Sequence, residues 1–388
     1  MKEFNNELSR LREQNLLRKL TCIASSHGSE ISIDGKTYIN FSSNDYLNLS
    51  HHPRILNTAI TALKKYGLGS GSSRLLSGTF IPHVTLEGRI ANYKKTQAAI
   101  VFNTGYAANA GTLPVLAGTD ALVFSDELNH ASIVDGLRLA KAKVKIYKHK
   151  DVDYLAHLLK SSSKNENIRR RLIITDSVFS MDGDIAPLPD IVYLCEKYDA
   201  FLMIDDAHAT GVLGKTGRGG LEHFGIKNNE RIIQMGTLSK AVGCFGAFVA
   251  GSRNLIDLLV SRARSFMYST SLPPATAEAC VMALHIIESG SGERRKKLWR
   301  NRQRLCKGLQ DLGYDTLRSE TPIIPVLAGD IKKALKISGH LYRERIFAPA
   351  IRPPTVPEGK CRIRFSVTSA HTNEDIDRLL EALWKTRP

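Results

Sequence analysis

Residues 231–251 read RIIQMGTLSKAVGCFGAFVAG and place one lysine, Lys240, between two apolar runs. RIIQMG and AFVAG each have the length and composition of a buried strand. A surface lysine normally has polar neighbours, whereas the neighbours of Lys240 are small or apolar. Loss of solvation favours the neutral amine, which is the form that acts as a nucleophile or a general base. We therefore expect Lys240 to be a reactive lysine.

Five further apolar runs precede this stretch, and amphipathic segments separate several of them. Strands that are buried on both faces are near-continuously apolar, and their alternation with helices is typical of a parallel sheet covered by helices. We therefore expect an α/β fold with a mainly parallel seven-stranded sheet. The short connection between RIIQMG and AFVAG allows one antiparallel exception. The five runs are AAIVFN (98–103), ALVFSD (121–126), VKIYKH (144–149), RLIITDS (171–177) and FLMIDDA (201–207).

The length of 388 residues exceeds what one compact core usually holds. After about residue 285 the pattern changes to a long charged helix, short apolar runs and a closing amphipathic helix. We expect an N-terminal segment with a helix and short strands (1–50), a large domain (51–284) and a small α+β C-terminal domain (285–388).

The net charge of +16 favours anionic partners such as phosphorylated cofactors, coenzyme A or an acidic carrier protein. The basic residues are spread along the chain without interleaved aromatic residues, so we expect no nucleic-acid partner. No apolar run approaches the roughly 20 residues of a membrane span, so we expect no membrane partner. The six scattered cysteines form no CxxC pair, and the charged N-terminus lacks the apolar segment of a signal peptide. We expect a cytoplasmic protein.

Polar residues follow the predicted strands, where ligands bind in open α/β sheets. A metal site at residues 205–208 would lack a third ligand with suitable spacing, so we expect no metal. One common cofactor, pyridoxal 5'-phosphate (PLP), needs all the kinds of polar group that follow these strands. It binds to a lysine, needs a helix N-terminus and hydroxyls for its phosphate, and needs a carboxylate for its pyridine nitrogen. In chain order the residues are Gly105 and Tyr106 at a helix start, His130, Ser180, Asp205 with Asp206 and His208, and Lys240.

Nine segments resemble, in order, the α-oxoamine synthases, which are PLP enzymes of fold type I. The resemblance runs from about residue 38 to the C-terminus. It implies decarboxylative condensation of an amino acid with an acyl thioester. The segments are FSSNDYLNLS (41–50), GSGSSRLLSGT (69–79), TGYAAN (104–109), DELNHASIVDG (126–136), VFSMDGDIAPL (178–188), DDAHATGVLG (205–214), GTLSKAVGCFG (236–246), YSTSLPPA (268–275) and RIRFSVTSAHT (362–372).

The resemblance implies a catalytic role for four residues. Lys240 would carry PLP, and Asp205 would pair with its pyridine nitrogen. His208 would bond the ring hydroxyl, and His130 would stack on the ring face. Asp206 is the less suitable carboxylate, because the carboxylate of this family lies three positions before the histidine.

The resemblance also implies phosphate and substrate contacts. Gly105, Tyr106, Thr237 and Ser239 would hold the phosphate. Thr270 would reach the phosphate in the second subunit of a homodimer with shared active sites. Ser180 would contact the cofactor and, with Asn44, line the reacting centre. Arg352 would hold the amino-acid carboxylate, since a planar guanidinium suits a carboxylate. Thr355 would join the substrate site, and Arg18 would meet the far end of the acyl chain.

Within this family, AIRPPTVPEGKCRIR (350–364) is most similar to the enzymes of biotin synthesis that join L-alanine to a pimeloyl thioester. The thioester could be pimeloyl-CoA or a pimeloyl-acyl carrier protein. The alternatives are a glycine C-acetyltransferase, a 5-aminolevulinate synthase, a serine palmitoyltransferase or an inactive homologue that serves as a binding subunit. Cys244 and Phe245 occupy positions where small residues are commoner, which leaves the size of the pocket open.

Overall fold

The computed structural model describes residues 2–163 and 167–386, and the chain divides into two compact units. The larger unit comprises Leu49–Ser180 and Ile185–Arg295. The smaller unit comprises Met1–Asn48, Met181–Asp184 and Lys296–Pro388. No helix within the described residues is long and apolar enough to cross a membrane.

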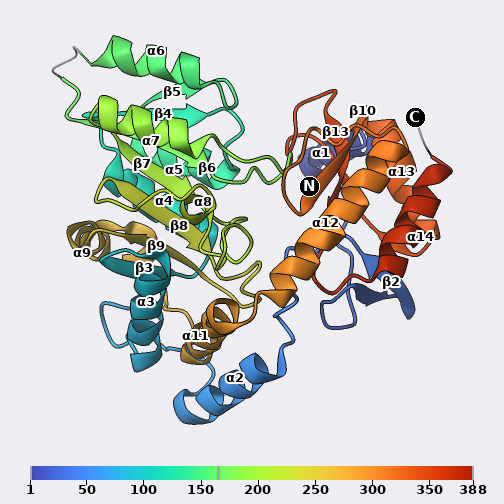
Figure 1. The fold of residues 1–388 in the computed structure, drawn as a ribbon, viewed down its shortest axis with the longest axis horizontal. Coiled ribbons are helices and arrows are strands. Elements are labelled where there is room, and N and C mark those ends of the chain that lie inside the picture. The colour runs from blue at the N-terminus through green and yellow to red at the C-terminus, as the bar shows by residue number, and fades with distance from the viewer. Residues whose placement is uncertain (1, 164–166, 387–388) are drawn as a thin grey trace. The chain divides into compact units, whose positions relative to one another are not determined.

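The larger unit is built on one seven-stranded sheet with the strand order β3-β9-β8-β7-β6-β4-β5 (Figure 1). Strand β9 is antiparallel to both of its neighbours, and the other pairs are parallel. The expected α/β fold, with a mainly parallel seven-stranded sheet, is therefore confirmed. The strands are β3 (Ala98–Phe102), β4 (Ala121–Asp126), β5 (Lys143–Tyr147), β6 (Arg170–Asp176), β7 (Phe201–Asp205), β8 (Ile232–Thr237) and β9 (Ala247–Gly251).

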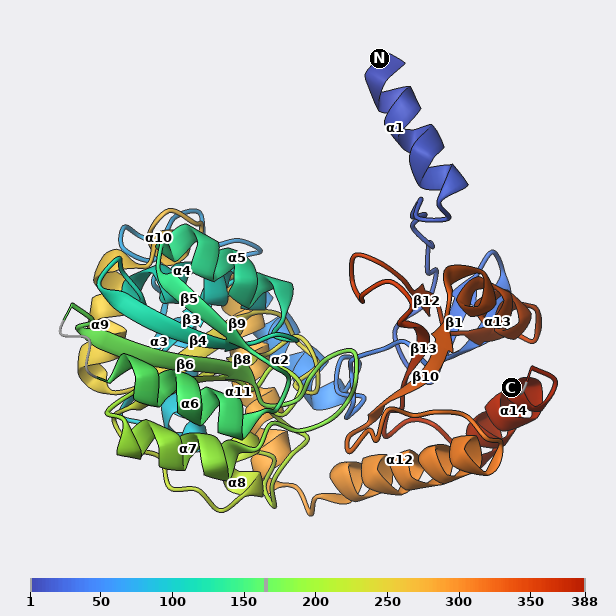
Figure 2. The ribbon, with the colours of Figure 1, turned by 90° about the horizontal axis from the view of Figure 1, so that it is seen from above.

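Helices cover both faces of this sheet. Along β4 the side chain of Val123 joins one hydrophobic core, whereas Leu122 and Phe124 join the other. The first core also takes residues of α4 (Gly105–Leu116), α5 (Ala131–Ala140) and α9 (Arg253–Arg262). The second takes residues of α6 (Val152–Ser162) and α7 (Leu188–Lys197). Figure 2 shows α4 and α5 on the opposite side of the strands from α6 and α7. Burial on both faces explains why the strands are continuously apolar.

Strand β5 differs from this pattern and corrects one expectation. Of its five residues only Tyr147 is buried, although the sequence pattern predicted burial on both faces. The reason is its place at the edge of the sheet, where it pairs with β4 alone. Lys143 is exposed and Lys145 is half-buried, and lysines are common on edge strands.

Among the remaining helices of the larger unit, α3 packs against β3 at one edge of the sheet. Helix α11 contacts both α2 and α3, and the loop between α2 and α3 holds the glycine-rich residues 67–79. At Gly78 a Cβ atom would lie 2.2 Å from Ser72 O and 2.7 Å from Ser271 Oγ, so only glycine fits there. The helices are α2 (Pro53–Tyr66), α3 (Ile81–Lys94), α8 (Gly220–His223), α10 (Arg264–Met267) and α11 (Pro274–Ser289).

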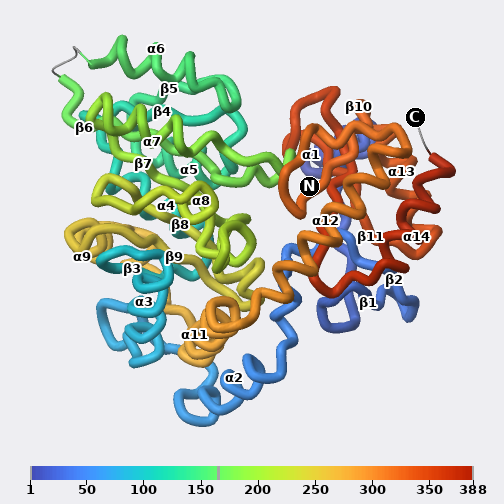
Figure 3. The backbone as a smooth tube through the Cα atoms, in the orientation of Figure 1, coloured from blue at the N-terminus to red at the C-terminus, as the bar shows by residue number. Residues whose placement is uncertain are grey.

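The smaller unit has an α+β architecture with two three-stranded sheets. Figure 3 shows its N-terminal strands, in blue, beside C-terminal elements in orange and red. The first sheet is β1 (Glu30–Ile33), β2 (Lys36–Asn40) and β11 (Ile346–Phe347). The second is β10 (Ile323–Gly329), β13 (Cys361–Ser366) and β12 (Ala350–Ile351). The helices are α1 (Lys2–Glu13), most of α12 (Glu293–Asp311), α13 (Ile331–Arg343) and α14 (Asn373–Trp384).

Candidate active site

Lys240 lies in a tight turn between β8 and β9. Leu238 N donates to Gly246 O at 2.9 Å, which closes the turn, and Gly243 N donates to Lys240 O at 2.8 Å. The lysine side chain is half-buried, and its Nζ lies 2.8 Å from Nε2 of His208. His208 follows β7, the strand beside β8. The structure thus brings together two residues that the sequence places 32 positions apart.

Asp205 ends strand β7 and is 3% exposed. Its Oδ1 accepts from the backbone N–H of Ala207 at 2.9 Å, and its Oδ2 accepts from Asn109 Nδ2 at 2.9 Å. Both donors are neutral, and within the described residues this carboxylate makes no ion pair with a cationic side chain. A buried carboxylate of this kind is suited to a cationic group of a ligand.

The neighbouring Asp206 is already neutralised. Its Oδ2 lies 2.6 Å from Nζ of Lys94, and both side chains are buried. Its Oδ1 accepts from Ser177 Oγ at 2.6 Å and from Gly220 N at 3.1 Å. Asp206 therefore has a structural partner for its charge, and Asp205 is the carboxylate that remains for a cofactor.

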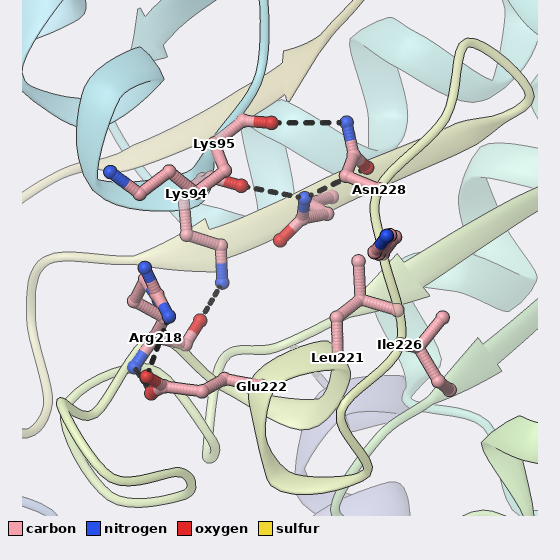
Figure 4. Close-up of a pocket in the computed structure, with 9 residues that line it drawn as sticks. Lys94, Lys95, Arg218, Leu221, Glu222, Ile226 and Asn228 are labelled. Atoms are coloured by element: carbon pink, nitrogen blue, oxygen red, sulfur yellow. Dashed lines mark hydrogen bonds and ion pairs between the residues drawn. The ribbon is translucent and has the colours of Figure 1, made fainter.

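A pocket of about 310 Å³ opens beside this ion pair, and Lys94 and Arg218 are among the residues that line it (Figure 4). The Lys94 ammonium donates to Arg218 O, and the Arg218 guanidinium bonds Glu222 at 2.8 Å. None of the site residues predicted from the sequence lines this pocket. We therefore place the candidate active site at Lys240 instead.

His130 precedes α5 and caps its N-terminus. Its backbone N–H donates to Asp176 Oδ2 at 2.8 Å, and its imidazole Nδ1 accepts from Ser132 N at 3.2 Å. Burial lowers the pKa of His130, Asp205 opposes this effect, and Lys240 adds to it. Burial also raises the pKa of Asp176, and the negative charge of Asp205 contributes.

The start of α4 offers free backbone donors. Thr104 caps the helix by accepting from Ala107 N at 3.1 Å. The N–H groups of Gly105 and Tyr106 have no hydrogen-bond partner within the part of the chain that the structure describes. A Cβ atom at Gly105 would lie 2.9 Å from Thr237 Cγ2, so the helix start and the end of β8 are in close contact. Unpaired N–H groups at a helix start form an anion site.

Ser180, Ser239 and Thr270 are the other predicted residues of the larger unit. Ser239 is exposed next to Lys240, and Ser180 is half-buried at the end of the first segment of this unit. Thr270 is exposed, and its carbonyl accepts from Asn103 Nδ2 at 2.7 Å. A β-bridge joins Thr270 to Ser73 of the glycine-rich loop.

The four remaining predicted residues lie in the smaller unit. Arg18 Nη2 donates to Thr355 Oγ1 at 3.3 Å, and Nη1 of Arg352 donates to the carbonyl of Asn15. Nε of Arg352 is buried without a partner among the described residues, and burial lowers the pKa of this guanidinium. Asn44 Oδ1 accepts from Arg364 Nη2 at 3.2 Å. Three of the four therefore form one group, and Asn44 lies in a separate one.

The sequence analysis missed Asn109, Ser132 and Asp176, which contact the predicted residues directly. A signal was present for two of them. Asn109 interrupts the apolar stretch AANAG, and Asp176 ends the apolar run RLIIT. Ser132 gave no such signal, because a serine near a helix start is ordinary capping chemistry.

A family model described as aminotransferase class I and II matches residues 36–383. An 8-amino-7-oxononanoate synthase from Symbiobacterium thermophilum is 50% identical, with coverage of 98% of this chain and 96% of that protein. One from Geobacter sulfurreducens is 47% identical, with coverage of 97% and 96%. The chain belongs to the 8-amino-7-oxononanoate synthase family.

Solved structures agree with this membership. A serine palmitoyltransferase from S. paucimobilis, solved with a PLP adduct, superposes with a TM-score of 0.92 at 29% identity, covering 99% of this chain and 96% of that one. An 8-amino-7-oxononanoate synthase from Francisella tularensis gives 0.76 at 28% identity, covering 90% and 97%. These matches confirm the resemblance to fold type I enzymes of the α-oxoamine synthase group and confirm PLP as the cofactor. The cation-free Asp205 and the unpaired N–H groups of α4 fit its pyridine nitrogen and its phosphate.

Proposed function

We propose that this member of the 8-amino-7-oxononanoate synthase family joins L-alanine to a pimeloyl thioester. The products would be 8-amino-7-oxononanoate, carbon dioxide and the free thiol, as a step of biotin synthesis. The observation that carries the proposal is the 2.8 Å contact of Lys240 Nζ with His208 Nε2, next to the buried carboxylate of Asp205.

The residues of the larger unit would hold PLP as follows. Lys240 binds it covalently, and Asp205 pairs with the pyridine nitrogen. His208 bonds the ring hydroxyl, and His130 lies against the ring face. The phosphate takes the N–H groups of the α4 start and nearby hydroxyls. The phosphate ligands are Gly105, Tyr106, Thr237 and Ser239, and Ser180 adds a further contact to the cofactor.

When bound, PLP supplies an electron sink that stabilises negative charge on the α-carbon of the amino acid. The chain moves the protons. Lys240 Nζ, held by His208, removes the Cα proton of L-alanine, which is general-base catalysis. A bond then forms from that carbon to the thioester carbonyl, and the carbon–sulfur bond breaks to release the thiolate. The Cα–carboxylate bond breaks as carbon dioxide leaves, and Lys240 returns a proton to the carbon.

For the smaller unit, we propose that Arg352 binds the substrate carboxylate. Its buried, unpartnered Nε supports this role, because a buried N–H without a partner is costly until a ligand accepts from it. Arg18 and Thr355, which bond each other beside it, would act on the acyl thioester or its substituents. Asn44 would contact the reacting groups.

We further propose a homodimer in which Thr270 contacts the phosphate in the second subunit. Thr270 is exposed, and its neighbours in the glycine-rich loop include two leucines, Leu75 and Leu76, with exposed fractions of 47% and 81%. Exposed apolar side chains of this kind are typical of protein interfaces.

We also propose a cytoplasmic location. The free state of all six cysteines supports a reducing compartment.

A serine palmitoyltransferase is the second candidate, because structures of that enzyme superpose with the higher TM-score. Thiol release by the PLP-loaded protein separates the candidates. We expect release with L-alanine and pimeloyl-CoA. Release only with L-serine and palmitoyl-CoA, or only with glycine and acetyl-CoA, would reassign the substrates. Silence in all three mixtures, together with failure to bind PLP, would support an inactive homologue.

A further inference from the structure

Two buried side chains connect Asp205 to His130. Nδ2 of Asn109 lies 2.9 Å from Asp205 Oδ2 and 2.9 Å from Ser132 Oγ. Ser132 Oγ in turn lies 2.8 Å from His130 Nδ1. Asn109 on α4 is fully buried, and Ser132 on α5 is 2% exposed. Hydrogen bonds therefore run without a break from strand β7 through α4 to α5.

The direction of each hydrogen bond follows from the chemistry of the groups. A carboxylate oxygen only accepts, so the amide of Asn109 must turn its NH2 group toward Asp205. The second hydrogen of that group goes to Ser132 Oγ, whose own hydroxyl hydrogen is free to donate to His130 Nδ1. The backbone N–H of Ser132 donates to the same nitrogen. Nδ1 of His130 therefore accepts and carries no hydrogen.

The carbonyl oxygen of the Asn109 side chain, in contrast to its NH2 group, makes no hydrogen bond within the described residues. Oδ1 of Asn109 is buried, and no described residue donates to it. A buried acceptor without a partner costs free energy, so an amide that served packing alone would be better replaced by an apolar side chain. The protein thus keeps an unfavourable buried acceptor along with the two N–H donors of the same amide.

We propose that Asn109 is a positioning residue that fixes His130 as the neutral tautomer with its hydrogen on Nε2. Its consequence rests on the proposed function, because a neutral imidazole presents an uncharged face to a pyridine ring that Asp205 keeps protonated. An imidazolium against that ring would repel it. Asn109 also fixes the carboxylate, since it holds Oδ2 of Asp205 while Ala207 N holds Oδ1.

The test is the tautomer of His130, read by ¹⁵N NMR on PLP-loaded protein labelled at histidine. His130→Gln assigns the resonance among the 12 histidines. We expect an unprotonated Nδ1 and a protonated Nε2. Asn109→Leu removes both donors at similar volume, so both tautomers should become populated. We expect kcat to fall about 10- to 100-fold, with the KM for L-alanine nearly unchanged.

Thr112→Val is the matched control. Thr112 lies on the same helix, is fully buried, and its hydroxyl has no partner among the described residues. This variant should keep both the spectrum and kcat. A hydrogen on Nδ1 in the unmutated protein would overturn the proposal. So would an Asn109→Leu protein that behaves like Thr112→Val.

Ser132→Ala covers the case in which Asn109→Leu does not fold. It removes the hydroxyl link but keeps the backbone N–H donor, so we expect the same change in the spectrum at smaller size. An unchanged spectrum would contradict the proposal. The spectrum is read whether or not L-alanine reacts. The expected tautomer in a protein without activity would therefore overturn the proposed function and support the hydrogen-bond assignment.

Discussion

Asp205, His208 and Thr237 of the larger unit are buried, whereas the four predicted site residues of the smaller unit are half-buried or exposed. Asp205 is 3% exposed and has two hydrogen-bond donors. Arg18 and Thr355 are exposed and contact each other at 3.3 Å. Groups that take part in bond breaking need fixed positions, and groups that admit a substrate need access. We propose from this difference that the larger unit carries the reaction chemistry and that the smaller one takes part in substrate recognition.

The largest expected effect is the loss of turnover when Lys240 of the larger unit is replaced. Lys240→Ala removes the general base and the covalent attachment of PLP. We expect turnover to fall by about 10⁴-fold or more and the absorbance of bound PLP to disappear. Lys215→Ala, an exposed lysine of the same unit, is the control and should keep both. A Lys240→Ala protein with normal absorbance and turnover would refute the role of this lysine.

The second prediction compares the two adjacent carboxylates. Asp205→Asn should retain part of the PLP but lose at least about 100-fold in turnover, because the pyridine nitrogen is no longer held protonated. Asp206→Asn leaves the Lys94 ammonium buried without its counter-charge, so we expect a loss of about 3–5 kcal/mol in the free energy of unfolding. Turnover and denaturant unfolding are measured on both. Near-normal turnover in Asp205→Asn would remove its role.

The sequence predicted the strands closely because each is a short apolar run followed by polar residues. It could not predict that VKIYKH lies at the edge, since strand order depends on packing between distant segments. The preference for Asp205 over Asp206 came from the resemblance alone and stays a prediction. The contact that supports it, between Asp206 and Lys94, joins residues 112 positions apart and has no signal in the sequence.

The third prediction concerns pH and the smaller unit. Burial lowers the pKa of His371 to about 4. Between pH 6.5 and about 4, the unfolded chain binds a proton at this histidine that the folded chain does not. The free energy of unfolding should therefore decrease as the pH is lowered through this range, by up to about 3 kcal/mol. His371→Gln should flatten this dependence in denaturant titrations, and His285→Gln, at an exposed site, should not. Equal curves for all three proteins would contradict the prediction.

The fourth prediction tests recognition. Arg352→Lys keeps the charge but loses the planar guanidinium. We expect the KM for L-alanine to rise about 10- to 100-fold with a smaller change in kcat. Arg18→Lys should instead affect the KM for the pimeloyl thioester. Steady-state kinetics with each substrate varied in turn separate the two. A large fall in kcat with unchanged KM in Arg352→Lys would show that this residue takes part in the reaction itself. That result would contradict the proposed division of roles between the two units.

The most direct test follows both products of the proposed condensation in one reaction. PLP-loaded protein is incubated with L-alanine labelled with ¹³C at its carboxyl carbon and with pimeloyl-CoA, and the free thiol and labelled carbon dioxide are measured together. We predict that the two appear in equal amounts and that Lys240→Ala forms neither. Thiol without labelled carbon dioxide would show thioester hydrolysis in place of condensation, and it would contradict the account.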